Sequence, residues 1–157
     1  MAIVKIINSN NLSNLINYIN DAKGHNDEII YFNGIGVNPR TAIRDMELCK
    51  KVYCQTRGSQ GKHIIVGFNK VEENQLIEKN IIDVVADNIA GTIYFHTGCQ
   101  IVYAVHGNTD NIHIHFALNS VRISDGYKIQ LNYRVKYMIE KDIRAYLSCI
   151  GNNQIYV

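Results

Sequence analysis

Three histidines are the residues of this sequence that most clearly indicate chemistry. His106, His113 and His115 fall within ten residues, although the whole 157-residue chain contains only six histidines. Alternate side chains of an extended strand share a face, so the spacing of His113 and His115 places two imidazoles on one surface. Converging neutral imidazoles can each offer a lone pair to one divalent metal ion, and three protein ligands leave coordination positions open, as in catalytic sites.

A β-hairpin is expected to bring the three histidines together. Residues 101–106 are apolar apart from the terminal His106, and they are followed by a short loop, residues 107–111, that is rich in turn-forming residues. Residues 112–121 then alternate between apolar side chains on one side and His113, His115 and Asn119 on the other. Pairing of these two strands would place His106 beside the His-x-His pair.

The remaining elements predict the sheet that carries this hairpin. Strands are expected at residues 3–7, 28–32 and 63–69, and helices at about residues 12–24, 39–53, 72–88 and 132–148. Strands interleaved with helices and followed by an antiparallel pair predict an α+β fold, with a mainly antiparallel central sheet and helices on one face. The opposite face, which would carry His63, Gly67 and the hairpin histidines, is expected to stay open for a ligand.

The composition is that of an ordinary soluble domain. With 46% hydrophobic and 19% charged residues, the chain is expected to form one domain over residues 1–157. It shows no signal-peptide pattern and no run of apolar residues long enough to span a membrane, so a cytoplasmic location is expected. The formal net charge is only +2, so nucleic-acid binding would depend on local basic patches such as the one around Arg57 and Lys62.

Several sequence blocks together are similar to the HUH endonuclease superfamily, and within it to the P-type relaxase/mobilisation nuclease family. The strongest block is the hairpin, with His106, Asp110, the His113-Ile114-His115 pattern and the following Asn119-Ser120-Val121. Two weaker blocks agree: Ile16-Asn17-Tyr18-Ile19, and Lys50 to Tyr53 followed by His63-Ile64-Ile65-Val66-Gly67-Phe68. Gly67 stands where the family commonly has serine.

This resemblance implies a ferredoxin/RRM-like HUH architecture and a metal-dependent DNA endonuclease. Members of the family nick plasmids or conjugative elements at a transfer origin by tyrosine transesterification, with Mn²⁺ or Mg²⁺ as cofactor and a 5′-phosphotyrosine as intermediate. The implied partners are single-stranded or melted origin DNA and accessory proteins of a relaxosome, without a membrane.

The resemblance also assigns roles to individual residues. His106, His113 and His115 would bind the metal, and Tyr18 would be the nucleophile. Tyr133 and Tyr137 are alternatives, because single-tyrosine HUH transposases carry their nucleophile on a helix after the His-x-His strand. A non-catalytic DNA-binding or regulatory protein with the same fold is a further alternative. Residues expected to orient the metal ligands or to contact DNA are Asp110, His63, Asn119, Gly67, Arg57 and Lys62.

Overall fold

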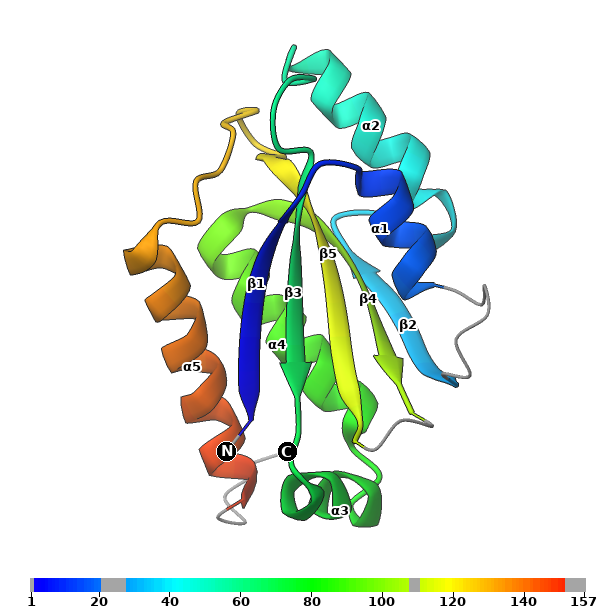
Figure 1. Ribbon diagram of the computed structural model, residues 1–157, viewed down its shortest axis with the longest axis vertical. Helices are drawn as coiled ribbons and strands as arrows, with labels where there is room; N and C mark the ends of the chain where they lie inside the picture. The colour runs from blue at the N-terminus through cyan, green and yellow to red at the C-terminus, as the bar shows by residue number, and fades with distance from the viewer. Residues whose placement is uncertain (1, 21–27, 108–110, 152–157) are drawn as a thin grey trace.

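The protein folds around one five-stranded sheet, as the computed structural model shows for residues 2–20, 28–107 and 111–151 (Figure 1). Every neighbouring pair of strands is antiparallel, and the strand order is β1-β3-β5-β4-β2. The α+β class and the antiparallel sheet expected from the sequence are therefore confirmed. The strands are β1 (Ile3–Ser9), β2 (Ile29–Ile35), β3 (Gly61–Gly67), β4 (Cys99–His106) and β5 (His113–Arg122).

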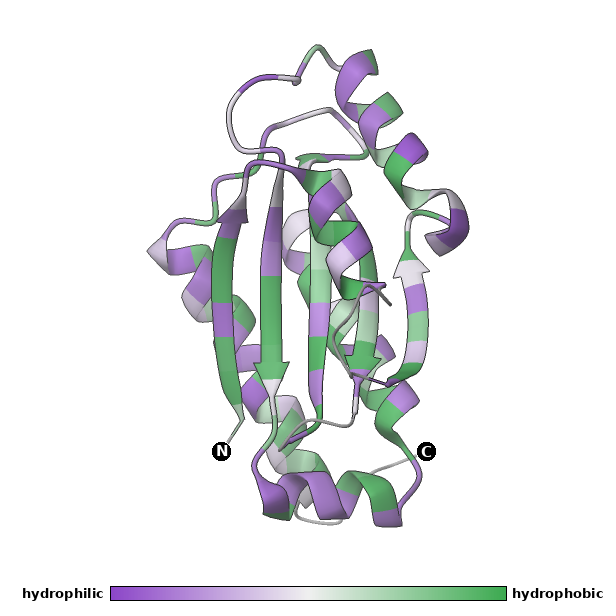
Figure 2. Ribbon diagram, turned by 45° about the vertical axis from the view of Figure 1, so that its right-hand side comes forward, coloured by the Kyte–Doolittle hydropathy of each residue, from purple (hydrophilic) through white to green (hydrophobic). Residues whose placement is uncertain are grey.

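One face of the sheet carries the main hydrophobic core. Ile64 and Val66 of β3 alternate with side chains of the other face, and they pair with Phe116 and Ile114 of β5. All four side chains are fully buried. They pack against helices α4 (Ile82–Thr97) and α5 (Tyr133–Gly151), which supply Ile89, Ile93, Ile139 and Ile143 to the same cluster. Figure 2 colours β1 in green bands separated by purple ones, which correspond to its apolar pairs Ile3-Val4 and Ile6-Ile7 and to the polar residues that follow them.

Two shorter helices cover part of the other face. Helix α1 (Leu12–Ile19) and helix α2 (Ala42–Val52) pack their apolar sides on Val102 and Ala117 of the central strands. In Figure 1, α1 lies in front of the sheet and α4 behind it. The expectation of helices on one face thus describes the large helices α4 and α5 but needs correction for α1 and α2. Their apolar stripes need burial, and small side chains such as Ala117 leave room for them.

The predicted helix over residues 72–88 is in fact two helices. Helix α3 (Lys70–Glu78) ends before Asn80, which adopts the left-handed backbone conformation with φ of 50°, and α4 begins at Ile82. Asparagine tolerates this conformation better than most residues and often terminates a helix. Helix α4 then continues to Thr97 and ends at Gly98, which has φ of 64°. The short 3-10 helix η1 (Pro39–Thr41) leads into α2.

No helix in the described residues is both long and apolar enough to cross a membrane.

Candidate active site

The three histidines meet at the end of the sheet where β4 turns into β5. His106 pairs with His113 across the two strands, so the hairpin predicted from the sequence is confirmed. The candidate ligand atoms of His106, His113 and His115 all lie within 4.8 Å of one another. His106 and His115 are almost completely buried, and His113 is half-buried. The cluster therefore opens to solvent on the side of His113.

Main-chain carbonyl groups fix the orientation of two of these rings. His106 Nε2 lies 2.7 Å from the carbonyl oxygen of Ile19, and His113 Nδ1 lies 3.1 Å from that of Asn111. A carbonyl oxygen only accepts hydrogen bonds, so both nitrogens must carry the proton. In the neutral ring the opposite nitrogen then has a lone pair, which makes His106 Nδ1 and His113 Nε2 the candidate metal-binding atoms.

A fourth histidine orients the third ring. His63 Nε2 lies 2.8 Å from His115 Nδ1. The other nitrogen of His115, Nε2, is buried and has no hydrogen-bond partner among the described residues. Burial is the main reason that the pKa of His115 falls to about 3, and the neighbouring imidazoles of His113, His63 and His106 lower it further. Burial, with a smaller effect of His106, also lowers the pKa of His63 to about 4, so both rings are neutral near pH 7.

The donor set fits a divalent metal ion. A buried imidazole nitrogen without a partner is costly, and a cation that accepts its lone pair removes that cost. His115 Nε2 is such an atom, and His106 Nδ1 and His113 Nε2 belong to the same cluster. Three neutral nitrogen donors leave coordination positions for substrate oxygens, and imidazole suits Mn²⁺ better than it suits Mg²⁺.

Tyr18 lies beside this cluster. The centroid of its ring is 5.6 Å from that of His115 and 6.0 Å from that of His63, and both contacts are edge-to-face. Its side chain is 46% exposed, whereas Leu15, Ile16 and Ile19 of the same helix are buried. Tyr18 therefore lies off the apolar stripe of its helix, and the phenol combines access to solvent with proximity to the histidines.

Helix α1 holds Tyr18 at this place from both of its ends. At its N-terminus, the side chain of Asn11 accepts a hydrogen bond of 2.8 Å from the backbone N–H of Asn14. At its C-terminus, Ile19 is fully buried, and its carbonyl oxygen accepts the hydrogen bond from His106. The helix that carries the tyrosine therefore also orients one of the candidate metal ligands.

The two rival tyrosines lie elsewhere. Tyr133 and Tyr137 are on α5, whose buried side chains pack on the opposite face of the sheet. Their rings stack on each other with centroids 6.4 Å apart, and they are 84% and 53% exposed.

The other predicted site residues are divided between the two ends of the sheet. Gly67 pairs with His113, so it lies beside the histidines as expected. Asn119 and Lys62 lie toward the other end of their strands, and both are buried. Asn119 donates to the Met46 carbonyl and to Gln100 Oε1, and Lys62 donates to Asn8 Oδ1.

Arg57 is exposed in the loop before β3, and its carbonyl oxygen accepts a hydrogen bond from Lys128. It therefore shares the end of the sheet that lies away from the histidines. Asp110 lies outside the described residues.

Some contributors to the site were missed in the sequence. The carbonyl groups of Ile19 and Asn111 have no signature there, because any residue supplies a carbonyl. His63 was identified as a candidate, but its bond to His115 depends on the pairing of β3 with β5, which follows from the strand order. A hairpin can be read from adjacent sequence, whereas the neighbour of a distant strand cannot.

Comparisons with known proteins give a family from one search and a similar fold from another. A family model described as "Relaxase: MobA/VirD2-like, nuclease domain" matches residues 18–147. A solved structure described as "Molecular Basis of Vancomycin Resistance Transfer in Staphylococcus aureus" superposes with a TM-score of 0.56 at 15% sequence identity. The superposition covers 98% of this chain and 92% of that chain, so the two share a fold over nearly their full length. A comparison with curated protein sequences gave no match.

Proposed function

Because this chain belongs to the MobA/VirD2-like relaxase nuclease domain family, we propose that it nicks one DNA strand at the transfer origin of a mobilisable or conjugative element. In this proposal, residues 1–157 form a single relaxase domain that acts in the cytoplasm on single-stranded or melted origin DNA, with accessory relaxosome proteins. The observation that carries the proposal is the position of the Tyr18 phenol beside the three-histidine cluster.

The proposed reaction is a transesterification at one phosphodiester. The Tyr18 hydroxyl oxygen forms a bond to phosphorus, and the bond from phosphorus to the 3′-oxygen breaks. The products are a 5′-phosphotyrosine and a free 3′-hydroxyl, and the proton lost by the phenol is balanced by the proton gained by the leaving oxygen. One ester replaces another, so the step is reversible and the strand can be rejoined.

His106, His113 and His115 would hold the metal through the three nitrogens identified above. When bound, a divalent cation such as Mn²⁺ or Mg²⁺ polarises the phosphate and offsets its negative charge. The chain orients these ligands through the Ile19 and Asn111 carbonyls and through His63. His115 must donate from Nδ1 if Nε2 binds the metal, so His63 accepts that bond at Nε2 and acts as a positioning residue.

Two observations support Tyr18 over Tyr133 and Tyr137 as the nucleophile. The rings of Tyr18 and His115 are in direct contact, whereas the two rival tyrosines are on the helix that packs against the opposite face. The α1 helix also has two anchors, the Asn11 cap and the bond from His106 to Ile19, that fix where its side chains point.

The test is formation of a covalent adduct. The protein is incubated with Mn²⁺ and a labelled oligonucleotide from the transfer origin of its own element, and denaturing electrophoresis then separates free DNA from protein-linked DNA. Tyr18→Phe should abolish the adduct, and the matched variant Tyr137→Phe should retain it. Loss of the adduct in Tyr137→Phe alone would support the transposase-like arrangement. A wild-type protein that binds this oligonucleotide but never forms the adduct would instead be a non-catalytic DNA-binding protein.

A further inference from the structure

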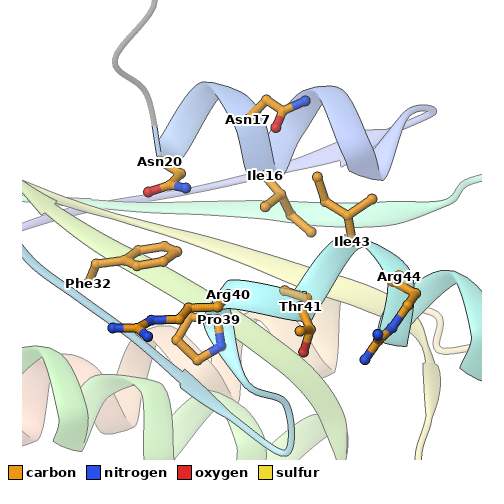
Figure 3. Close-up of a pocket in the computed structure, with 10 residues that line it drawn as sticks. Ile16, Asn17, Asn20, Phe32, Pro39, Arg40, Thr41, Ile43 and Arg44 are labelled. Atoms are coloured by element: carbon orange, nitrogen blue, oxygen red, sulfur yellow. The ribbon is translucent and has the colours of Figure 1, made fainter.

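A cavity of about 710 Å³ lies on the other side of α1 from Tyr18. In Figure 3, Ile16, Asn17 and Asn20 of α1 form one wall, and Phe32, Pro39 and Arg40 lie across from them. Tyr18 and Asn20 are two positions apart, so at 3.6 residues per turn they project from nearly opposite sides of the helix. The volume lies within the range of roughly 300–1,000 Å³ that is typical of sites for small organic groups.

The cavity wall combines an aromatic ring with amide groups. Phe32 is partly buried and packs against the apolar cluster beneath α1, so its ring has a fixed support. Asn17 and Asn20 are exposed at the rim, and each amide group can both donate and accept a hydrogen bond. An aromatic face stacks on any nucleobase, and amide groups pair with the polar edges of bases.

The charge of the cavity favours an anion. Among the described residues, its lining contains Arg40 and Arg44 but no carboxylate residue. Arg44 forms an ion pair of 2.9 Å with the neighbouring Asp45, which offsets part of its charge. Arg40 is exposed, and no carboxylate in the described part of the chain forms an ion pair with it. Its guanidinium is therefore available to pair with a phosphate in the geometry that arginine prefers.

We propose that this cavity is a nucleotide subsite for the DNA strand that is nicked. An unpaired base stacks on Phe32, the Asn17 and Asn20 amides contact its edge, and Arg40 binds an adjacent phosphate. The inference rests on the proposed function for the identity of the DNA. Because α1 carries the nucleophile on one side and the cavity on the other, and is only about 10 Å wide, the bound base belongs to a nucleotide close to the scissile phosphate.

The first test separates recognition of bases from recognition of phosphates. Binding of single-stranded oligothymidylate and of an abasic oligonucleotide of the same length is measured by fluorescence anisotropy without metal. The wild type should prefer the strand with bases by roughly five- to a hundredfold, the effect of one stacked base. Phe32→Ala should remove this preference. Arg40→Ala should weaken the binding of both strands equally. Asn20→Ala should change the order of affinity for homopolymers of the four bases.

Arg134→Ala is the matched control, because Arg134 is exposed on α5, away from the cavity. It should leave both affinities unchanged. Photocrosslinking with an oligonucleotide that contains iododeoxyuridine supplies a second readout on the wild-type protein, and the crosslinked peptide should contain Phe32.

The subsite is ruled out if the wild type binds both strands equally. It is also ruled out if the preference for bases survives in Phe32→Ala and Asn20→Ala while the crosslink maps elsewhere. Neither result depends on the adduct assay, because binding is measured without metal and without strand cleavage. If the protein forms the Tyr18 adduct but binds both strands equally, the proposed function is supported and the subsite is ruled out.

Discussion

His63 is the single residue whose proposed role is most sharply defined by geometry. It is not a member of the candidate ligand group, but its Nε2 is 2.8 Å from His115 Nδ1. Loss of such an orienting partner typically lowers metal affinity by about 10- to 100-fold. We therefore expect His63→Ala to weaken Mn²⁺ binding by this amount in calorimetric titration. His63→Gln should recover part of the affinity, because its amide oxygen can accept the same hydrogen bond.

His96→Ala is the control for this experiment. His96 also has one strong partner, since its Nε2 lies 2.7 Å from Asp142 Oδ2, but this pair joins α4 to α5 on the other face. Mn²⁺ affinity should not change in His96→Ala. An equal loss of Mn²⁺ affinity in both variants would mean that His63→Ala lowers the general stability of the protein and does not act through the orientation of His115.

At the residue scale, the sequence predicted the residues that belong to a local pattern. His106, His113 and His115 share one hairpin, and the two-residue period of a strand was enough to place them together. The sequence predicted both Lys62 and Gly67 as site residues, but it did not show that they occupy different parts of β3. The two positions belong to opposite faces and lie near opposite ends of the strand, so Gly67 is beside the histidines and Lys62 is not.

At the scale of secondary-structure elements, α1 links the proposed nucleophile to the candidate metal ligands, and the contribution of its N-cap can be tested. Asn11→Ala removes the hydrogen bond to the Asn14 N–H and should reduce the free energy of unfolding by about 1 kcal/mol. Because α1 carries Tyr18 and the carbonyl that orients His106, the rate of adduct formation should also fall. Thermal denaturation and the adduct assay measure the two effects.

Asn69→Ala provides the matched cap substitution on α3. Asn69 accepts hydrogen bonds of 2.9 Å from the N–H groups of Val71 and Glu72, so its loss should cost a similar free energy. No residue of α3 belongs to the histidine cluster, and adduct formation at a temperature where both variants are folded should be close to wild type. Slow adduct formation in Asn69→Ala would show that the rate depends on the global stability of the protein and not on how well α1 is fixed.

Most of the elements were predictable because they have a clear period and clear ends. The apolar side chains of Leu12, Leu15, Ile16 and Ile19 have the spacing of a helix, as observed in α1, and Pro39 suits the helical start at η1, which leads into α2. The break between α3 and α4 was missed, because no glycine or proline marks it and Asn80 alone takes the strained conformation. The apolar positions continue through the break, so periodicity alone does not detect it.

At the scale of the whole molecule, the buried imidazoles predict how stability depends on pH. The pKa values of His63 and His115 lie at about 4 and about 3 in the folded protein, below the ordinary value of about 6.5. Below pH 6.5 the unfolded chain binds protons at these two sites and the folded chain does not, so stability falls as the pH falls. The slope should approach about 1.4 kcal/mol per pH unit for each group.

Urea unfolding of the metal-free protein between about pH 6.5 and pH 5 measures this slope, in a range above the ordinary pKa values of carboxyl groups. His63→Gln removes one of the two groups and should roughly halve the slope. A slope that is unchanged in this variant would mean that His63 is protonated in the folded protein.

The α+β class was predictable from the sequence. The presence of helices on both faces of the sheet was not. Alternation along the strands indicated which side chains share a face, and this pattern is confirmed for β3 and β5. Whether a helix lies over the second face depends on where α1 and α2 find complementary small residues, such as Ala117, in distant strands. Such long-range complementarity is a property of the assembled sheet.

The strand order also determines when each strand can find its partner during synthesis of the chain. Among the described strands, β1 pairs only with β3, and β3 pairs with β5, so β1 has no partner strand in the nascent chain until β3 has been synthesised. Tyr18 is synthesised before Val102 and Ala117, which cover the apolar side of its helix in the folded protein. A nascent chain therefore contains the proposed nucleophile before the histidines that Tyr18 faces, and the site can assemble only after β5 has emerged.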